Sequence, residues 1–199
     1  KREPCRGPAA VCARQSGTHQ RRASSGQHIA QGLNCASTMR LKMPFSTTTP
    51  FDSIAPVQMT AQHLSEVLSV EQSAYSHPWT LGNFGDSIAS GYHMPVWFQD
   101  QHLLGYLVAM RGADELHLLN ITVAPGFRRR GWGGHMLRTL IDWARERGVH
   151  AIWLEVRASN QAGIALYQAH GFDLQGERKN YYPLSSHQRE DAVVMGLQW

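Results

Sequence analysis

Cysteine is missing from residues 51–199, and its absence restricts the chemistry that this part of the chain can perform. The three cysteines, Cys5, Cys12 and Cys35, all lie near the start of the chain, with a spacing that matches no zinc-binding signature. A catalytic thiol is therefore excluded from the later residues, and an odd number of cysteines argues against a disulfide framework. A cysteine-free body is typical of a reducing compartment, so we expect a cytoplasmic protein.

Long apolar runs and, near the start, acidic residues are also scarce. No run approaches the ~20 apolar residues that a helix needs to span a bilayer, so we expect no membrane partner. Residues 1–42 hold eight Lys or Arg and the single acid Glu3, a charge of +7. The rest of the chain holds 11 basic and 14 acidic residues, a charge of −3, against +4 for the whole. The basic excess belongs to the start, so we expect no direct nucleic-acid binding by the rest.

Residues 1–50 show no sustained apolar periodicity and are rich in Arg, Ser, Gly, Gln and Thr, which predicts a disordered basic extension. Because the chain begins at Lys1, one interpretation is translated sequence upstream of a start at Met39 or Met43. An Arg-rich targeting peptide is a second interpretation, and a basic arm that holds nucleic acid is a third. Residues 51–199 are predicted to form one globular domain.

The apolar pattern of that domain predicts the element order β-α-α-β-β-β-α-β-α-β-β, a mixed α/β fold without internal repeats. Helices are expected after the N-cap residues Thr60 and Thr80 and over residues 132–147 and 160–170. Strands are expected over residues 54–59, 93–99, 103–111, 115–123, 150–156, 172–182 and 192–198. The eleven histidines are scattered without a ligand-like pair, so we expect no metal site.

A glycine loop joins the strand over residues 115–123 to the following helix. The loop holds Arg128, Arg129, Arg130, Gly131, Gly133 and Gly134 in an Arg-x-x-Gly-x-Gly spacing, with Trp132 inside it. Free N–H groups at a helix start form an anion site, glycines allow close approach of a phosphate, and arginines add charge. A glycine-rich turn beside a solvated charge run would have the same composition.

This combination resembles the Gcn5-related N-acetyltransferase (GNAT) superfamily, over about residues 54–198. The resemblance implies a central twisted mixed sheet flanked by helices and acetyl-CoA as cosubstrate. It assigns the loop residues just named to the pyrophosphate. It assigns the backbone of Ile121, Thr122 and Val123, on a strand splayed by a bulge, to the pantetheine arm.

Glu155 is the one charged residue in the apolar strand segment 151–156. Apolar surroundings favour the proton-binding form of a carboxylate, as a general base acting near neutral pH requires, although a strand-end Glu can also simply be exposed. Asn160 and Tyr167 are two helical turns apart and share a face. Asn160 can serve as an N-cap, and Tyr167 can pack on Phe172. Gly163 between them is expected to cost ~1 kcal/mol relative to Ala and to loosen this helix.

Longer motifs resemble the RimI-type ribosomal-protein alanine N-acetyltransferases. They are His-Pro-Trp at 77–79, Glu-Val-Arg-Ala-Ser-Asn at 155–160, Ala-Leu-Tyr-Gln-Ala-His-Gly-Phe at 165–172, Asn-Tyr-Tyr at 180–182 and Arg-Glu-Asp-Ala at 189–192. The resemblance makes Glu155 the general base, Tyr167 the general acid and Asn160 a coenzyme contact. Tyr181 and Tyr182 are expected in the peptide groove, the alternative being ordinary strand aromatics. Arg157 and Arg178 are expected in solvent, the alternative being contact with acidic positions of the substrate.

The predicted reaction is direct acetyl transfer from acetyl-CoA to the N-terminal alanine amine of a small-subunit ribosomal protein. An α-amino group titrates ~2.5 units below lysine, so more of it is neutral and nucleophilic at pH 7. Acetylation of lysine or of a small-molecule amine by the same fold is the alternative, and a nucleic-acid-binding module that uses the basic start is a rival from another class. The sequence leaves the oligomeric state open.

Overall fold

The computed structural model describes residues 51, 53–185 and 187–199. The extension predicted over residues 1–50 lies outside the described residues, so its disorder stays a prediction.

The described residues form one sheet with the strand order β1-β2-β3-β4-β5-β7-β6. The strands are β1 (Val57–Gln58), β2 (Pro95–Gln99), β3 (His102–Arg111), β4 (Glu115–Val123), β5 (Ala151–Arg157), β6 (Asp173–Pro183) and β7 (Arg189–Gln198). β4 and β5 run parallel, and the other neighbouring strands run antiparallel. The predicted mixed sheet is confirmed, and its parallel pair lies at the centre.

Four helices connect these strands in the described part of the chain, in the predicted order. They are α1 (Leu64–Ala74), α2 (Leu81–Ala89), α3 (Trp132–Glu146) and α4 (Gln161–Gln168), with 3₁₀ turns at Ala61–His63 and Pro125–Phe127. Thr80 caps α2 as predicted, because its hydroxyl accepts a hydrogen bond of 3.2 Å from the Asn83 backbone N–H. Thr60 caps the 3₁₀ turn ahead of α1, so the first helix begins with a tighter turn than its sequence pattern indicates.

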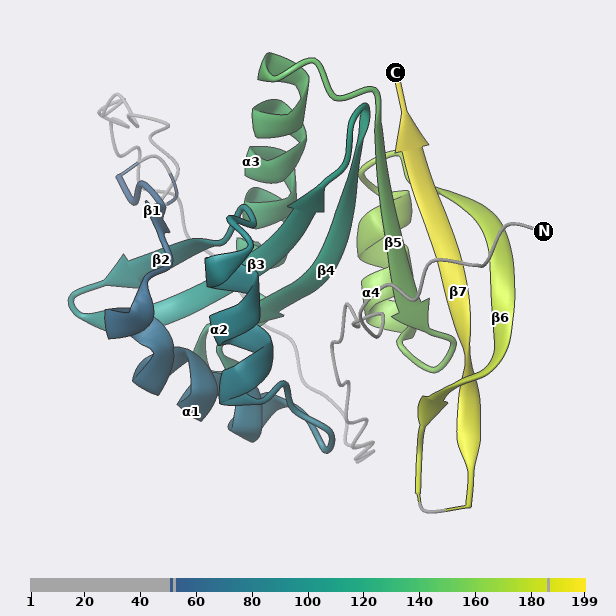
Figure 1. Ribbon diagram of the computed structural model, residues 1–199, viewed down its shortest axis with the longest axis horizontal. Helices are drawn as coiled ribbons and strands as arrows, with labels where there is room; N and C mark the ends of the chain where they lie inside the picture. Colours follow the sequence, from purple (N-terminus) through teal and green to yellow (C-terminus); the bar gives the residue numbers. More distant parts are fainter. Residues whose placement is uncertain (1–50, 52, 186) are drawn as a thin grey trace, which may run out of the picture.

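The sheet has helices on both of its faces (Figure 1), and each face carries a hydrophobic cluster. α1 and α2 contribute to one cluster, and α3 and α4 contribute to the other. Along β3, Tyr106 and Val108 belong to the first cluster whereas Leu107 and Ala109 belong to the second, as the alternation of a strand buried on both faces requires. Helices therefore cover both faces of the sheet at β3, whereas β5 is buried only on the face toward α3 and α4.

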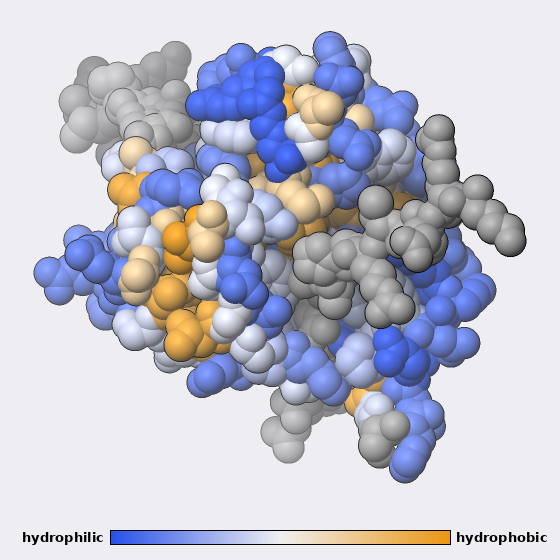
Figure 2. Space-filling view, viewed as in Figure 1, coloured by the Kyte–Doolittle hydropathy of each residue, from blue (hydrophilic) through white to orange (hydrophobic). Residues whose placement is uncertain are grey.

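Hydrophobic and hydrophilic residues separate on the surface. Figure 2 shows hydrophobic residues gathered over α1 and α2, while the side formed by β6 and β7 is mostly hydrophilic. No helix in the described part of the chain combines the length and the apolar character that crossing a membrane requires.

Candidate active site

Strands β4 and β5 separate halfway along β4. Their parallel pairing ends at Leu118, and the register with β3 shifts at the same point, leaving Leu119 as an extra residue. This is a β-bulge, which bends a strand and interrupts its hydrogen bonding. Beyond it, Ile121, Thr122 and Val123 pair with β3 but have no partner on β5. The main chain of these residues is thus open on the β5 side to an extended ligand that pairs like a strand.

The side chain of Thr122 is used inside the fold. It is 1% exposed, its hydroxyl donates to Asn120 Oδ1 at 2.9 Å, and it lies 2.8 Å from the Tyr75 hydroxyl. The Tyr75 contact connects β4 to the segment between α1 and α2. Because the side chain is already bonded within the protein, the backbone is what residue 122 offers to a ligand.

The glycine loop opens into a hollow at the N-terminus of α3. Gly131 is the N-cap with φ 87°, a left-handed conformation that glycine adopts without strain. At Gly134 the reason for glycine is space, because a Cβ there would lie 3.2 Å from the His170 ring. The hollow measures about 190 Å³ and is lined by Val123, Phe127, Arg128, Arg129, Gly131, Trp132, Gly133, Gly134, Ala162 and Leu166. It is therefore formed by the loop, the end of β4 and one side of α4.

The three loop arginines differ in their surroundings. Arg128 donates from Nε to the Val123 carbonyl at 3.2 Å, and Arg129 has φ 60°. Arg130 lies over the Phe127 ring at 5.6 Å and does not line the hollow. The structure therefore brings Arg128 and Arg129 to the predicted phosphate site, together with the three glycines, and turns Arg130 away from it.

Glu155 lies one residue beyond the point where β5 leaves β4. Its side chain is 14% exposed, and its Oε1 forms an ion pair of 2.9 Å with Arg178 Nη2. Its second oxygen, Oε2, is buried and has no hydrogen-bond partner among the described residues. The exposed strand-end interpretation is therefore wrong, because the carboxylate is mostly covered at the mouth of the β4–β5 gap.

Asn160 caps α4 and retains bonding capacity. Its Oδ1 accepts a hydrogen bond of 3.0 Å from the Gly163 backbone N–H, while its Nδ2 is buried without a partner among the described residues. A Cβ at residue 163 would lie 2.6 Å from that Nδ2. Glycine is thus required at 163 to make room for the cap, and α4 continues through it without interruption.

Tyr167 is 1% exposed and lies on α4 two turns after Asn160. Its ring centroid is 5.8 Å from that of Phe172, so the packing contact expected from the sequence is present. Packing of the ring leaves the role of the hydroxyl open. The predicted function of Tyr167 as the acid therefore stays a prediction.

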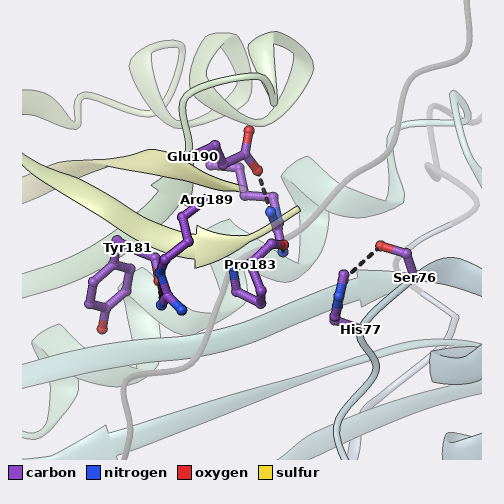
Figure 3. Close-up of polar contacts among 7 residues, drawn as sticks. Ser76, His77, Tyr181, Pro183, Arg189 and Glu190 are labelled. Atoms are coloured by element: carbon purple, nitrogen blue, oxygen red, sulfur yellow. Dashed lines mark hydrogen bonds and ion pairs between the residues drawn. The ribbon is translucent and has the colours of Figure 1, made fainter. Parts of the chain in front are cut away.

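A bulge in the β6–β7 hairpin fixes the two tyrosines. Pairing shifts between Arg178 and Tyr182, and Asn180 there has φ 51°, which Asn tolerates better than most residues. Asp191 accepts a 2.8 Å hydrogen bond from the Asn180 N–H, and Arg189 donates to the Asn180 carbonyl. Arg189 also donates to the carbonyl of Tyr181, and Figure 3 shows these two residues side by side. The Asn-Tyr-Tyr and Arg-Glu-Asp segments, on the two strands of this hairpin, are thus one bonded unit.

Arg157 and Arg178 both pair with carboxylates, but only Arg157 is covered. The predicted solvation of Arg157 is therefore wrong, whereas the Arg178 side chain is 54% exposed, as predicted. Arg157 forms an ion pair with Glu190, which Figure 3 shows beside Pro183, and each side chain is 12% exposed. Arg157 also lies over the Tyr182 ring at 4.7 Å, and Arg178 lies over the Tyr181 ring at 5.3 Å. Sequence alone could not reveal these pairs, because each joins residues on different strands whose partners are set by the pairing of β7 with β5 and with β6.

Comparison with known proteins agrees with this geometry. The model of the acetyltransferase (GNAT) family matches residues 63–172. The chain is 40% identical over 128 residues to the ribosomal protein bS18-alanine N-acetyltransferase of Escherichia coli, covering 64% of this chain and 86% of that protein. The chain belongs to the GNAT acetyltransferase family. The superfamily resemblance and the enzyme class predicted from the sequence are confirmed.

Two further GNAT relatives show how much of the chain the likeness covers. The ribosomal protein bS18-alanine N-acetyltransferase of Haemophilus influenzae is 36% identical over 138 residues, 69% of this chain and 94% of that protein. The crystal structure of the Escherichia coli ribosomal-protein-S18-alanine N-acetyltransferase superposes with a TM-score of 0.68 at 36% identity, covering 73% of this chain and 93% of that chain. The likeness therefore spans nearly the whole of each relative and leaves out the basic start of this chain.

The GNAT fold accounts for the positions of most predicted site residues. The open backbone of β4 borders the β4–β5 gap with Glu155 at its mouth, and the glycine loop borders the adjoining hollow. Asn160 caps α4, the helix that lines one side of that hollow. Ala162 and Leu166 were not predicted, yet they line the hollow, and their i, i+4 spacing on α4 was the available signal. Among residues 51, 53–185 and 187–199 no group of three or more His, Cys, Asp or Glu could hold a metal ion.

Proposed function

We propose that this GNAT enzyme acetylates the N-terminal α-amine of a protein, with an alanine-initiated protein of the ribosomal S18 type as its acceptor. The relationship to the bS18-alanine N-acetyltransferases supports this acceptor class. The observation that carries the proposal is the buried, unpartnered Oε2 of Glu155 beside the β4–β5 gap. A ribosomal acceptor would place the activity in the cytoplasm.

The residues present fit acetyl-CoA. A pantetheine arm carries amides that can pair with the open main chain of Ile121, Thr122 and Val123. The buried Nδ2 of Asn160 can donate to a carbonyl of the arm, which would complete its hydrogen bonding. Gly131, Gly133 and Gly134 at the start of α3 offer backbone N–H groups to the pyrophosphate, with Arg128 and Arg129 alongside. Bound there, acetyl-CoA supplies an activated acetyl thioester.

Glu155 acts as the general base in this proposal. Its Oε2, directly or through a water, takes a proton from the acceptor nitrogen while that nitrogen forms a bond to the acetyl carbonyl carbon. Backbone N–H groups of the bulged β4 segment stabilise charge on the carbonyl oxygen. Tyr167 donates its hydroxyl proton to the sulfur as the carbon–sulfur bond breaks. No covalent enzyme intermediate forms, in agreement with the absence of cysteine from residues 51–199.

The acceptor is expected along the β6–β7 hairpin. Tyr181 and Tyr182 stand on the bulge that Arg189 and Asp191 hold, and their ring centroids are 4.9 Å apart. Tyr182 is 3% exposed and supports the hairpin from within, whereas Tyr181 is partly exposed and lies under Arg178, the ion-pair partner of Glu155. A rigid aromatic ring at this position can order the first residues of a peptide at low entropic cost. The hydrophilic character of this side in Figure 2 suits a polar peptide better than an apolar ligand.

The deciding experiment measures thiol release from acetyl-CoA with a short peptide beginning Ala-Arg and with the same peptide blocked at its N-terminus. Release with the free amine alone is the expected result. Release with both peptides would point to an internal amine, and release only with lysine peptides or small amines would favour the alternative acceptor. Deletion of residues 1–42 is expected to leave turnover unchanged. If salt-dependent nucleic-acid binding depended on that segment and no amine were acetylated, the binding-module rival would be supported.

A further inference from the structure

The two oxygens of the Glu155 carboxylate have different surroundings. Oε1 is 2.9 Å from Arg178 Nη2, whereas Oε2 is buried and has no hydrogen-bond partner among the described residues. A buried carboxylate oxygen without a donor is costly, so such an atom in a folded protein indicates a ligand or a water that completes it. The acceptor amine carries the N–H groups that would do so.

Arg178 reaches Glu155 across an intervening strand. In the order β5-β7-β6, Glu155 pairs with Val194 of β7 and Arg178 pairs with Ala192, two residues away on the same strand. Positions two apart on β7 share a face of the sheet, so both side chains project to one side. A long Arg side chain is needed to reach the second strand, and a planar guanidinium holds the carboxylate in a defined orientation.

Two contacts orient the Arg178 side chain, which is 54% exposed. Arg178 starts the bulge that Asp191 and Arg189 hold, and its guanidinium lies over the Tyr181 ring at 5.3 Å. The neighbouring charges are occupied with one another, since Lys179 bonds Glu177 and Asp191. Arg157 and Glu190 pair with each other in the same way. Arg178 is thus the cation that the hairpin directs to Glu155.

We propose that Arg178 is a positioning residue that turns Glu155 Oε2 toward the acceptor and makes the site select the neutral form of the acceptor amine. The proposal rests on the proposed function of Glu155 as the base. The carboxylate already has a cationic partner, and that partner is itself close to the position of the acceptor nitrogen. An ammonium therefore gains little attraction and meets a like charge, whereas a neutral amine meets neither penalty. A site of this kind favours an α-amine over a lysine, because far more of the α-amine is neutral at pH 7.

The test compares Arg178→Gln and Arg178→Lys with Arg145→Gln in the full-length protein. Arg145 is a matched control, because it is an exposed arginine that lies over an aromatic ring, that of Trp199, at 5.0 Å at the far end of α3. Turnover of an Ala-Arg peptide is measured together with the KM for acetyl-CoA and the melting temperature. Inhibition is measured with two unreactive peptides of the same sequence, one with a permanently charged trimethylated N-terminus and one with an acetylated, neutral N-terminus.

For Arg178→Gln we expect kcat to fall about tenfold, since a base that has lost its orienting partner spends less time in the productive geometry. The trimethylated peptide should bind about fivefold more tightly, as expected for loss of a partly exposed like charge. The acetylated peptide, the KM for acetyl-CoA and the melting temperature should not change. Arg178→Lys should restore the discrimination against the charged peptide and part of kcat, and Arg145→Gln should match the unaltered enzyme.

Three outcomes would overturn the inference. One is an unchanged affinity of Arg178→Gln for the trimethylated peptide, a second is equal behaviour of the Lys and Gln variants, and a third is an equal change in the affinity of both inhibitors. If Glu155→Gln abolishes turnover while Arg178→Gln keeps the kcat and the selectivity of the unaltered enzyme, the role of Arg178 fails and the proposed function stands. If no amine is acetylated by the unaltered enzyme, the proposed function itself fails.

Discussion

The two sides of the candidate active site are built in different ways. The coenzyme side consists mainly of backbone, with an open stretch of β4, the glycine loop and the N-terminus of α3, to which Arg128, Arg129 and Asn160 add side chains. The acceptor side consists largely of side chains that contact one another. Glu155 forms an ion pair with Arg178, Arg157 forms one with Glu190, and Asp191 accepts a hydrogen bond from the Asn180 N–H. One side is a local arrangement of a few consecutive residues, and the other joins strands that are distant in sequence.

This difference teaches where each side tolerates change. A backbone site depends on conformation, so it is sensitive to glycine replacement and insensitive to most other side chains. A site of paired side chains depends on partners, so removal of one partner leaves the other unsatisfied or misplaced. Substitutions on the coenzyme side should therefore change the kinetics for acetyl-CoA, and substitutions on the acceptor side should change the kinetics for the peptide. Four predictions test this division.

The largest effect is expected for Glu155→Gln. General-base catalysis contributes about 10²- to 10⁴-fold, so turnover of an Ala-Arg peptide should fall at least ~100-fold while the KM for acetyl-CoA stays the same. Steady-state kinetics with both substrates measures this. Glu177→Gln is the control, an exposed Glu that bonds Lys179 on the same hairpin, and it should leave turnover unchanged. Normal turnover by Glu155→Gln at all pH values would remove Glu155 as the base.

Gly131→Ala should affect the coenzyme side alone. Residue 131 has φ 87°, where an L-residue costs roughly 1–2 kcal/mol, and its Cβ would lie 3.0 Å from the Phe51 ring. The loop must shift, and the KM for acetyl-CoA should rise about tenfold. The KM for the peptide should be unchanged. Gly126→Ala is the matched control, since a Cβ there meets nothing within 4 Å. Equal kinetics of the two variants would show that the loop does not bind the coenzyme.

Asp191→Ala should affect the acceptor side alone. The Lys179 ammonium and the Asn180 N–H lower the pKa of Asp191, so this carboxylate is ionised and holds the bulge at neutral pH. Its removal should raise the KM for the acceptor peptide about threefold, within the range of exposed charge-assisted contacts, with the KM for acetyl-CoA unchanged. Asp191→Asn keeps an oxygen that can accept the Asn180 hydrogen bond, so its KM for the peptide should lie between those of the unaltered enzyme and Asp191→Ala. A change in the acetyl-CoA KM alone would contradict the division of the site.

The smallest effect is expected in the scaffold, at His93. Burial, and then the positive charge of Arg147, lower the pKa of His93 from 6.5 to about 4, and its ring stacks on Trp143 at 3.8 Å. The pKa of His93 is lower in the folded protein than in the unfolded chain. Its contribution to the free energy of unfolding is therefore complete above pH 6.5 and is lost as the pH falls toward 4. The free energy of unfolding should therefore fall by about 1 kcal/mol between pH 7 and pH 5, a value reduced here because the ring is partly exposed.

His93→Phe keeps the stacking and removes the titration. Its melting temperature should therefore fall less than that of the unaltered protein between pH 7 and pH 5. The two KM values at pH 7 should not change, because His93 pairs with Ala109 on the far side of the bulge from the open β4 segment. Identical pH dependence of the two melting curves would exclude His93 as the titrating group.

Several elements could be predicted from the sequence because their signals are local. The strand over residues 115–123 and the helix that begins at residue 132 match β4 and α3, and Thr80 caps α2 as its position indicated. The conformation of the glycine loop follows from the spacing of Gly131 and Gly133 before an amphipathic helix. The reason for Gly163 was not predictable, since it depends on where the Asn160 side chain turns.

What the sequence by itself determined is the order of the elements, the glycine loop and the identity of the residues that can move protons. Each of these depends on neighbours within a few positions, where periodicity and backbone preferences act directly. Only the tertiary structure decided which charges meet. Arg157 was predicted to be solvated, and no ion pair was predicted for Arg178. The Glu155–Arg178 and Arg157–Glu190 pairs exist because β7 lies between β5 and β6 and pairs with both strands. Partner choice between distant strands is set by the register of that pairing, and no short stretch of sequence encodes it.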